Sequence, residues 1–306
     1  MKFVFPLALS VAFIISSRAA SYTNAPDADA FVRAAPGTTN LNYGAAGALS
    51  LSGPTATNAL GVTNGIYDTF IRYNTAALVT NFNALFGPGN WVVTHATLQV
   101  TEQGTPNNNI FNRGAGSFQI RWIANTNWTE GTGTPMNLTT DGICYTNEPG
   151  LLNSNTDMNL GTFTNSGMTM TLFFALSLPA GFVNTVTAGG EVDFYLTALT
   201  PSIGFTFNSH QFGTQSQWPL LEISAEPQPG LVGISLSGTN VVLSCTNGAV
   251  GETCLVLAST NLVLPLNQWP PVATNQLGAT GNFSVTVTNA AGPAALPETY
   301  FILQAQ

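Results

Sequence analysis

Charged side chains are scarce in this sequence. Lys, Arg, Asp and Glu make up only 7% of the 306 residues, against about 25% in an ordinary globular protein. The surface must therefore be built from Thr, Asn, Ser, Gln and Gly, which favour strands and turns over exposed, salt-bridged helices. Lys2 is the only lysine, and the formal net charge is −8. A nucleic-acid partner is excluded because it would require a basic patch.

Cysteine is scarce as well, and the three present are Cys144, Cys245 and Cys254. Their spacing does not suit zinc. Cys245 and Cys254 flank residues 246–253, which have the composition of a hairpin loop. On paired strands the two would form a disulfide, which an exported protein permits; the alternative is two buried free thiols. Cys144 is left over and is expected to be a small buried hydrophobe.

Long apolar runs are confined to the start of the chain. Lys2 precedes the apolar segment Phe3–Ile15, and Ser17-Arg18-Ala19 offers small residues for cleavage. We predict a signal peptide at residues 1–19, the alternative being a short N-terminal membrane anchor. No later run reaches transmembrane length, so we expect a secreted, extracellular or cell-surface protein with no membrane span after cleavage.

Most later segments have the pattern of β-strands, with short runs of Val, Ile, Phe, Tyr and Thr separated by Gly, Pro and Asn. Strands recurring about every 8–15 residues predict an antiparallel sandwich or jelly roll. Residues 67–73 alternate, which predicts one buried face. Only residues 75–86 have helical spacing, with Thr75 as cap and Gly87 at the end, so we expect a single helix.

The composition changes at Glu226-Pro-Gln-Pro-Gly230, which is typical of a linker. Six strand-like runs follow in the last 76 residues, as in a small immunoglobulin-like or fibronectin-III-like sandwich. We therefore predict an all-β chain. Its parts are the signal peptide (1–19), a jelly-roll domain (20–226), a linker (227–230) and an Ig-like β-sandwich domain (231–306).

The most distinctive stretch runs from Trp128-Thr-Glu-Gly-Thr-Gly-Thr-Pro135 to Asp141-Gly-Ile-Cys-Tyr-Thr-Asn-Glu-Pro149. With other segments, it resembles the secreted bacterial domains named after the motif DNRLRE, relatives of TGF-β-propeptide-like jelly rolls and of a carbohydrate-binding module family. The other matching segments are Asp29–Arg33, Asn42–Gly44, Thr69–Tyr73, Ala96–Leu98, Phe207–Ser209 and Pro219–Ile223. The resemblance implies a jelly roll that binds polysaccharide. It also implies a structural calcium, for which Asp27 and Asp29 are candidate ligands.

Catalysis has weak support in the sequence. A glycoside hydrolase needs two carboxyl groups placed for acid–base or nucleophilic work. The candidates are Glu130, Asp141, Glu148, Asp157 and Asp68. Nothing in the sequence pairs them, so we expect no enzyme; Glu130 and Asp141 are expected instead to brace the distinctive stretch together with Trp128. His95 and His210 are far apart in the chain and have the character of ordinary polar side chains.

Carbohydrate binding has better support. Sugars are recognised by aromatic rings and a few hydrogen-bonding side chains. Trp128 and Trp218 lie beside turns, and Arg113 and Asn108 lie in a polar loop, so these four are the ligand-binding candidates. The alternatives are a packing role for Trp128 and a solvated loop. With so few arginines, a neutral polysaccharide is a better ligand than an acidic one.

Three functional hypotheses follow. The first is a secreted, non-catalytic protein whose larger domain binds polysaccharide or associates with the cell surface or matrix. The second is a purely structural surface protein without a glycan site. The third, and least favoured, is a polysaccharide lyase or hydrolase.

Overall fold

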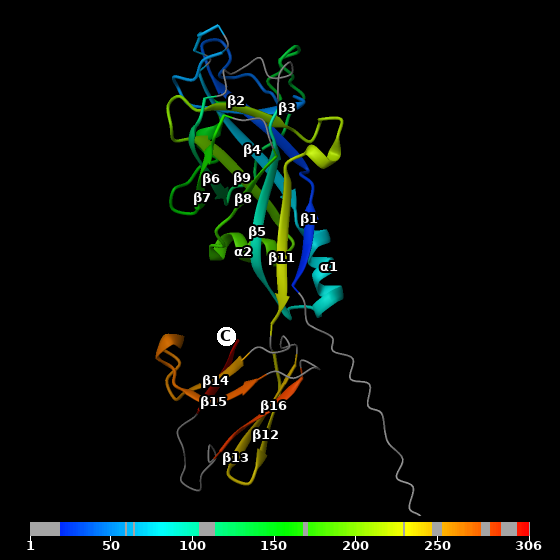
Figure 1. Cartoon of the computed structure of the whole chain (residues 1–306), viewed down its shortest axis with the longest axis vertical. Coiled ribbons are helices and arrows are strands. Elements are labelled where there is room, and N and C mark those ends of the chain that lie inside the picture. The colour runs from blue at the N-terminus through cyan, green and yellow to red at the C-terminus, as the bar shows by residue number, and fades with distance from the viewer. Residues whose placement is uncertain are drawn as a thin grey trace, which may run out of the picture. The chain divides into compact units, whose positions relative to one another are not determined.

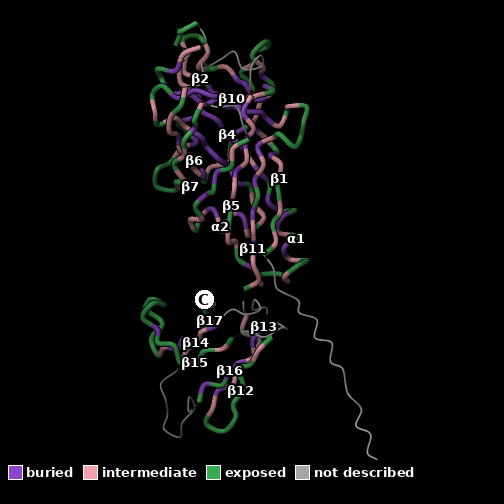
Figure 2. Tube along the Cα trace, viewed as in Figure 1, coloured by how far each residue is buried: buried purple, intermediate pink, exposed green. Residues whose placement is uncertain are grey.

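The computed structural model describes residues 19–58, 60–63, 65–103, 114–167, 171–228, 230–246, 253–276, 282–288 and 299–305. The chain divides into two compact units (Figure 1). The larger unit comprises Ser21–Asn81 and Val93–Ser224, and the smaller unit includes Phe82–Val92 and Ala225–Gln306. In the larger unit, buried residues follow the strands, whereas exposed residues gather in the segments between them (Figure 2). The predicted all-β sandwich fold is confirmed.

The larger unit contains two sheets. A four-stranded sheet has the order β1-β11-β5-β8, and a seven-stranded sheet has the order β10-β3-β4-β9-β6-β7, with β2 also paired to β4. Phe118 on β6 contacts Phe174 on β8 with ring centroids 5.2 Å apart, so side chains of both sheets share one core. The strands are β1 (Ala20–Asn24), β2 (Ala28–Ala34), β3 (Ala48–Ser52), β4 (Ile66–Asn74), β5 (Trp91–Thr101), β6 (Gly116–Ile123), β7 (Met158–Asn165), β8 (Thr171–Ala175), β9 (Glu191–Ala198), β10 (Gly204–Asn208) and β11 (Leu220–Pro227).

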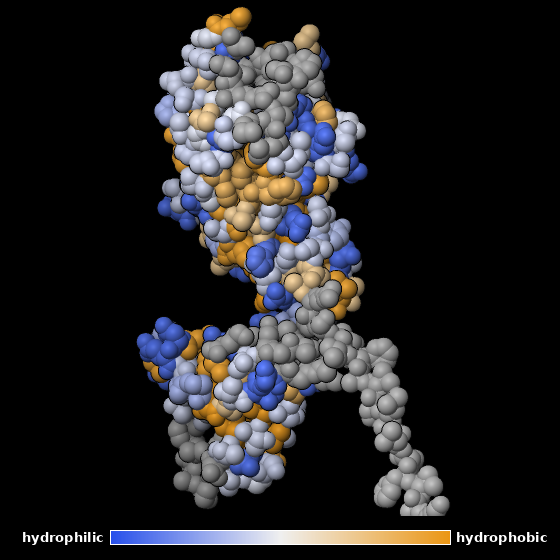
Figure 3. Space-filling model, viewed as in Figure 1, coloured by the Kyte–Doolittle hydropathy of each residue, from blue (hydrophilic) through white to orange (hydrophobic). Residues whose placement is uncertain are grey.

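The surface reflects the shortage of charge. In Figure 3 the most hydrophilic residues form small separate groups on the visible face, between apolar and weakly polar ones. Phe173 on β8 is 65% exposed, and Leu199 after β9 is 50% exposed. Single exposed apolar side chains of this kind are normal in a folded protein.

The described residues include two α-helices. The predicted helix is present as α1 (Ala76–Phe86) and ends at Gly87, whose positive φ of 87° suits glycine. The expectation of a single helix is wrong, because α2 (Ala180–Thr187) follows Pro179 and buries Phe182 and Val186 one turn apart. Among the described residues, no helix has the length and apolar character needed to cross a membrane.

Thr75 does not cap α1 with its side chain. Its hydroxyl donates to the carbonyl of Gly190, while the Asn74 side chain accepts the N–H of Ala76 at 3.0 Å. The cap therefore lies one residue earlier than predicted.

The smaller unit contains all six predicted strands. They form two three-stranded sheets, in the orders β12-β13-β16 and β15-β14-β17. Their facing side chains make a small core that includes Val241, Leu243, Val256 and Val285. The strands are β12 (Gly230–Ser237), β13 (Asn240–Thr246), β14 (Thr253–Ser259), β15 (Pro271–Gln276), β16 (Phe283–Val287) and β17 (Tyr300–Ala305).

Of the two alternatives for Cys245 and Cys254, a disulfide or two buried free thiols, the structure shows the free thiols. Cys245 lies on β13 and Cys254 on β14, and these strands belong to different sheets, so they do not form the hairpin on which the pairing was based. Both are buried free thiols. Burial, followed by the proximity of Cys254, raises the pKa of Cys245 to about 11, which keeps the thiol protonated. Cys144 is also free and buried.

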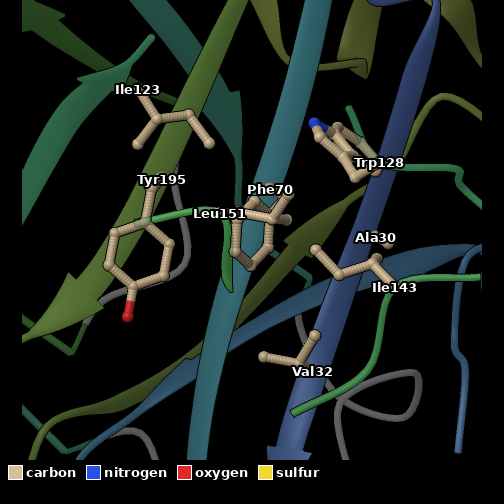
Figure 4. Packing of buried hydrophobic residues seen from close by; sticks show 8 residues of the cluster. All are labelled: Ala30, Val32, Phe70, Ile123, Trp128, Ile143, Leu151 and Tyr195. Carbon is tan, nitrogen blue, oxygen red and sulfur yellow. The ribbon is translucent and has the colours of Figure 1, made fainter. Parts of the chain in front are cut away.

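Residues 128–149, the signature loop, cover the outer face of the seven-stranded sheet. On that face, Phe70 of β4 pairs with Ala30 of β2 and with Tyr195 of β9. Figure 4 shows Trp128 and Ile143 of the loop gathered around Phe70. Residues on the opposite face of β4 point into the sandwich. β4 is therefore buried on both faces, whereas the alternation in its sequence predicted only one buried face.

Asn42 fixes the signature loop to the rest of the larger unit. Its fully buried amide donates to the carbonyls of Glu130 (2.6 Å) and Ile143 (2.9 Å) and accepts the N–H groups of Gly44 and Gly133. A Cβ added at Gly131, where φ is 80°, would lie 2.4 Å from the Asn42 side chain. Glycine is thus required at 131, because the backbone approaches this amide closely there.

Truncation of Trp128 tests whether the signature loop belongs to the core. Its side chain is only 7% exposed, so Trp128→Ala should lower the free energy of unfolding by about 3–5 kcal/mol, as for other large core truncations. Denaturant unfolding measures this change. Trp218→Ala is the control, because Trp218 is only half-buried and should cost less. An unchanged midpoint for Trp128→Ala would show that the loop does not pack as described.

Candidate functional site

The outer face of the seven-stranded sheet carries a buried ion pair that holds the signature loop. Arg72 Nε lies 2.9 Å from Asp193 Oδ1, and the indole N–H of Trp128 donates to the same oxygen at 3.1 Å. The Arg72 guanidinium lies over the Trp128 ring, 4.6 Å from its centroid, and donates to the Thr126 carbonyl. Burial raises the pKa of Asp193 to about 6, although Arg72 opposes this rise.

A pocket of about 200 Å³ opens farther along β4 and β9, at Asp68 and Thr197. Asp68 of β4 and Glu148 of the signature loop both line it, and both are 4% exposed. The Tyr195 hydroxyl donates to Glu148 Oε1 at 2.7 Å. We call it the carboxyl pocket; its lining residues are Ser52, Gly53, Pro54, Ile66, Asp68, Tyr145, Glu148, Pro149, Tyr195, Thr197 and Ala198.

The two carboxyl groups of the pocket each keep one oxygen without a protein partner. Asp68 Oδ1 and Glu148 Oε2 are buried and make no hydrogen bond to any described residue. Burial raises the pKa of Asp68 to about 6. Burial, and then the charge of Asp68, raises the pKa of Glu148 to about 7. Buried acceptors without partners are rare in folded proteins and call for a donor from outside the chain.

A second cluster joins three distant segments of the larger unit. Asp29 of β2, Glu130 of the signature loop and His210, which follows β10, place one ligand atom each within 4.8 Å of one another. Burial raises the pKa of Asp29 and of Glu130. Burial lowers the pKa of His210, but its contact with Asp29 outweighs this effect and raises it. We call this group the His210 cluster.

Of the four predicted ligand-binding residues, two lie in the part of the chain that the structure describes. Trp128 is buried and hydrogen-bonded to Asp193, so it has the packing role given as the alternative and offers no exposed stacking surface. Trp218 is half-buried and meets the edge of His210, with ring centroids 6.0 Å apart. Arg113 and Asn108 lie outside the described residues.

The predicted brace residues lie on different parts of the signature loop. Glu130 accepts the N–H of Asp29 at 3.0 Å. Asp141 is exposed and accepts hydrogen bonds from the hydroxyls of Thr132 (2.7 Å) and Thr139 (2.6 Å), which lowers its pKa to about 2. Both carboxylates therefore tie segments of backbone together.

The expected calcium pair of Asp27 and Asp29 does not form one cluster with further ligands, because Asp27 is not part of the group around Asp29. Asp27 is exposed, and the described acidic and histidine side chains that converge with Asp29 are Glu130 and His210. Asp157 forms an ion pair with Arg121 at 3.6 Å and accepts backbone N–H groups, which is a structural arrangement.

Sequence reasoning named Asp68 and Glu148 singly but did not pair them. The two residues meet only because the signature loop crosses β4 near Asp68, and no local sequence pattern predicts where the loop crosses. The alternation of β4 does place Asp68 on the same face as Phe70 and Arg72, so half of the pocket had a sequence signal.

Comparison with known proteins gives no family. No protein-family model and no curated protein matches the chain. Among solved structures, a β-glucuronidase from Ruminococcus gnavus in complex with N1-substituted uronic isofagomine is 8% identical, with a TM-score of 0.25 over 88% of this chain and 40% of that one. A Lactobacillus rhamnosus β-glucuronidase is 11% identical, with a TM-score of 0.24 over 93% of this chain and 44% of that one.

The chain thus spans less than half the length of these enzymes. Similarity at this level supports no statement about the fold or the activity of this protein.

The raised pKa values of the carboxyl pocket predict a stability that falls with rising pH. Both groups bind protons more tightly when folded, so their contribution is full below about pH 4 and is lost as pH rises through about 6–7. For Asp68 alone the loss is about 3 kcal/mol. Asp68→Asn should therefore flatten the dependence of unfolding free energy on pH between about pH 4 and about pH 8.

Asp141→Asn is the matched control. Asp141 is exposed and its pKa is lowered to about 2, so this variant should keep the wild-type slope over the same range. Equal slopes for wild type and Asp68→Asn would contradict the pKa assigned to Asp68.

Proposed function

We propose that the larger unit is the carbohydrate-binding domain of a secreted protein and takes one sugar residue of a neutral polysaccharide in the carboxyl pocket. The observation that carries the proposal is the pair of buried, partnerless oxygens, Asp68 Oδ1 and Glu148 Oε2. Hydroxyl groups of a sugar are donors of the required kind. The proposal keeps the expected binding activity and moves its site away from Trp128.

The lining of the carboxyl pocket supports a sugar over other ligands. Tyr145, Pro149 and Ile66 supply apolar surface beside the two carboxyl groups and the Thr197 side chain. Sugars need this combination because their rings have apolar faces and polar edges. The volume of about 200 Å³ is below that of a drug-sized pocket, which suits one sugar residue of a longer chain.

The charge of the pocket selects a neutral ligand. An acidic sugar would bring a third carboxylate next to Asp68 and Glu148, at a low local dielectric and in a chain with a formal net charge of −8. In this proposal the domain is of the DNRLRE type, and the smaller unit is a spacer or an attachment module. A purely structural surface role is the alternative that the binding experiment tests.

A second candidate function is glycoside hydrolysis. A Glu148 carboxyl with a pKa of about 7 next to Asp68 is the kind of group that serves as a general acid. Release of reducing ends from a bound polysaccharide, abolished in Glu148→Gln, would establish this activity. Binding without turnover would support the non-catalytic proposal.

Calorimetric titration of the purified chain with neutral oligosaccharides tests the proposal. At about pH 8, above the pKa values of about 6 and 7, Glu148→Gln and Asp68→Asn each replace a charged acceptor. Each should therefore weaken binding by at least about tenfold, the equivalent of one charge-assisted hydrogen bond. Trp218→Ala lies outside the carboxyl pocket and should bind as wild type does.

Two results would contradict the proposal. One is the absence of binding to any neutral glycan by a folded chain, which would favour the structural role. The other is a loss of binding in Trp218→Ala with full binding in Glu148→Gln, which would move the site to the surface around His210.

A further inference from the structure

The His210 cluster lies outside the carboxyl pocket, and the proposed function does not use it. Its three side chains come from β2, from the signature loop and from the segment after β10. None of them lines the carboxyl pocket. The convergence of three titratable side chains from distant parts of the chain is therefore not explained by the proposed function.

The distances within the cluster match the spacing of donors around one ion. His210 Nδ1 lies 3.2 Å from Asp29 Oδ2 and 3.4 Å from Glu130 Oε1. Donors held about 2.0–2.1 Å from a tetrahedral zinc ion are separated by about 3.3–3.4 Å. Closing on an ion thus requires only small movements of these side chains.

Two atoms of the cluster are buried without a satisfactory partner. Asp29 is fully buried, and its Oδ1 makes no hydrogen bond to any described residue. His210 Nδ1 is within ion-pair distance of both carboxylates but is not aligned for a hydrogen bond with either. Such atoms are expensive to bury, and a cation bound by the Asp29 carboxylate and His210 Nδ1 would offset that cost.

Backbone and side-chain donors orient the carboxylates toward this point. Asp29 Oδ2 accepts the N–H of His210 at 2.7 Å, and Glu130 Oε1 accepts the N–H of Asp29 at 3.0 Å. The Gln211 amide donates to the same oxygen of Glu130 at 2.7 Å. Hydrogen bonds to the ligand oxygens are a regular property of metal sites, because they fix the ligands before the ion arrives.

The donor set selects the class of ion. Two carboxylates and one neutral imidazole carry a charge of about −2, which balances a divalent cation. Imidazole is a ligand for zinc and related first-row metals, whereas calcium prefers oxygen alone. We infer that Asp29, Glu130 and His210 form a binding site for a divalent transition-metal ion, of which zinc is the preferred candidate. The bound ion would link β2 and the signature loop to the segment after β10.

Metal binding also sets the tautomer of His210. Coordination through Nδ1 leaves the proton on Nε2. The side-chain nitrogen of Gln211 donates to Glu130 Oε1 at 2.7 Å, so Gln211 is a positioning residue for Glu130.

Zinc titration of chelator-treated protein tests the inference. Wild type should bind one zinc ion per chain, and its melting temperature should rise with zinc concentration, because only the folded chain brings the three ligands together. His210→Gln should weaken zinc binding by at least about 100-fold, and Gln211→Ala by about 10-fold. His95→Gln removes the other histidine, which is exposed, and should bind as wild type does.

Cobalt substitution of the wild type gives a readout that does not depend on the folding of a variant. Visible d–d bands without a thiolate charge-transfer band support ligation by nitrogen and oxygen at the His210 cluster. A thiolate band would place the metal on the cysteines and overturn the inference. Equal affinity for zinc and calcium, equal zinc affinity in His210→Gln and wild type, or no zinc-dependent melting shift would overturn it as well.

Discussion

The contact of Arg72 with Asp193 and Trp128 is the interaction on which the rest of the larger unit depends. It buries a carboxylate on the outer face of a sheet, pairs it with a guanidinium and an indole N–H, and lays the guanidinium on the indole ring. In a chain with five arginines and one lysine, few such pairs are available. Removal of one partner would leave a buried charge unpaired, which is strongly destabilising. The signature loop is therefore held as firmly as a strand.

Both candidate sites follow from the position of that loop. Glu148 near its end reaches Tyr195 and faces the pocket with Asp68, whereas Glu130 near its start meets Asp29 and His210. In each case the loop brings a carboxyl group to an acidic residue that a strand has already buried. Two carboxylates at short range raise each other's pKa, and the pair is stabilised by a proton, by hydroxyl donors or by a cation. The sandwich thus holds one acidic residue of each site in place, and the signature loop brings the second carboxyl group to it.

The strands and one helix could be predicted because they depend on local pattern. All six strands of the smaller unit and α1 are present where alternation and helical spacing indicated them. The helix α2 was missed because it is short and rich in Thr and Val, and β7 because Asn, Gly and Thr interrupt its apolar residues. The carboxyl pocket and the His210 cluster could not be predicted, since each pairs residues at least 80 positions apart. Glycine at 131, 133 and 142 marked a tight loop, but its partner Asn42 became evident only in the fold.

Amide hydrogen exchange in the signature loop tests the central claim most directly. The N–H groups of Ile143 and Gly133 donate to the Thr129 carbonyl at 2.8 Å and to Asn42 Oδ1 at 2.9 Å, under a face of buried side chains. If the loop is part of the core, these amides should exchange as slowly as that of Phe70 on β4, through global unfolding. Exchange at the rate of an exposed loop would contradict the account, because neither site could then be held together.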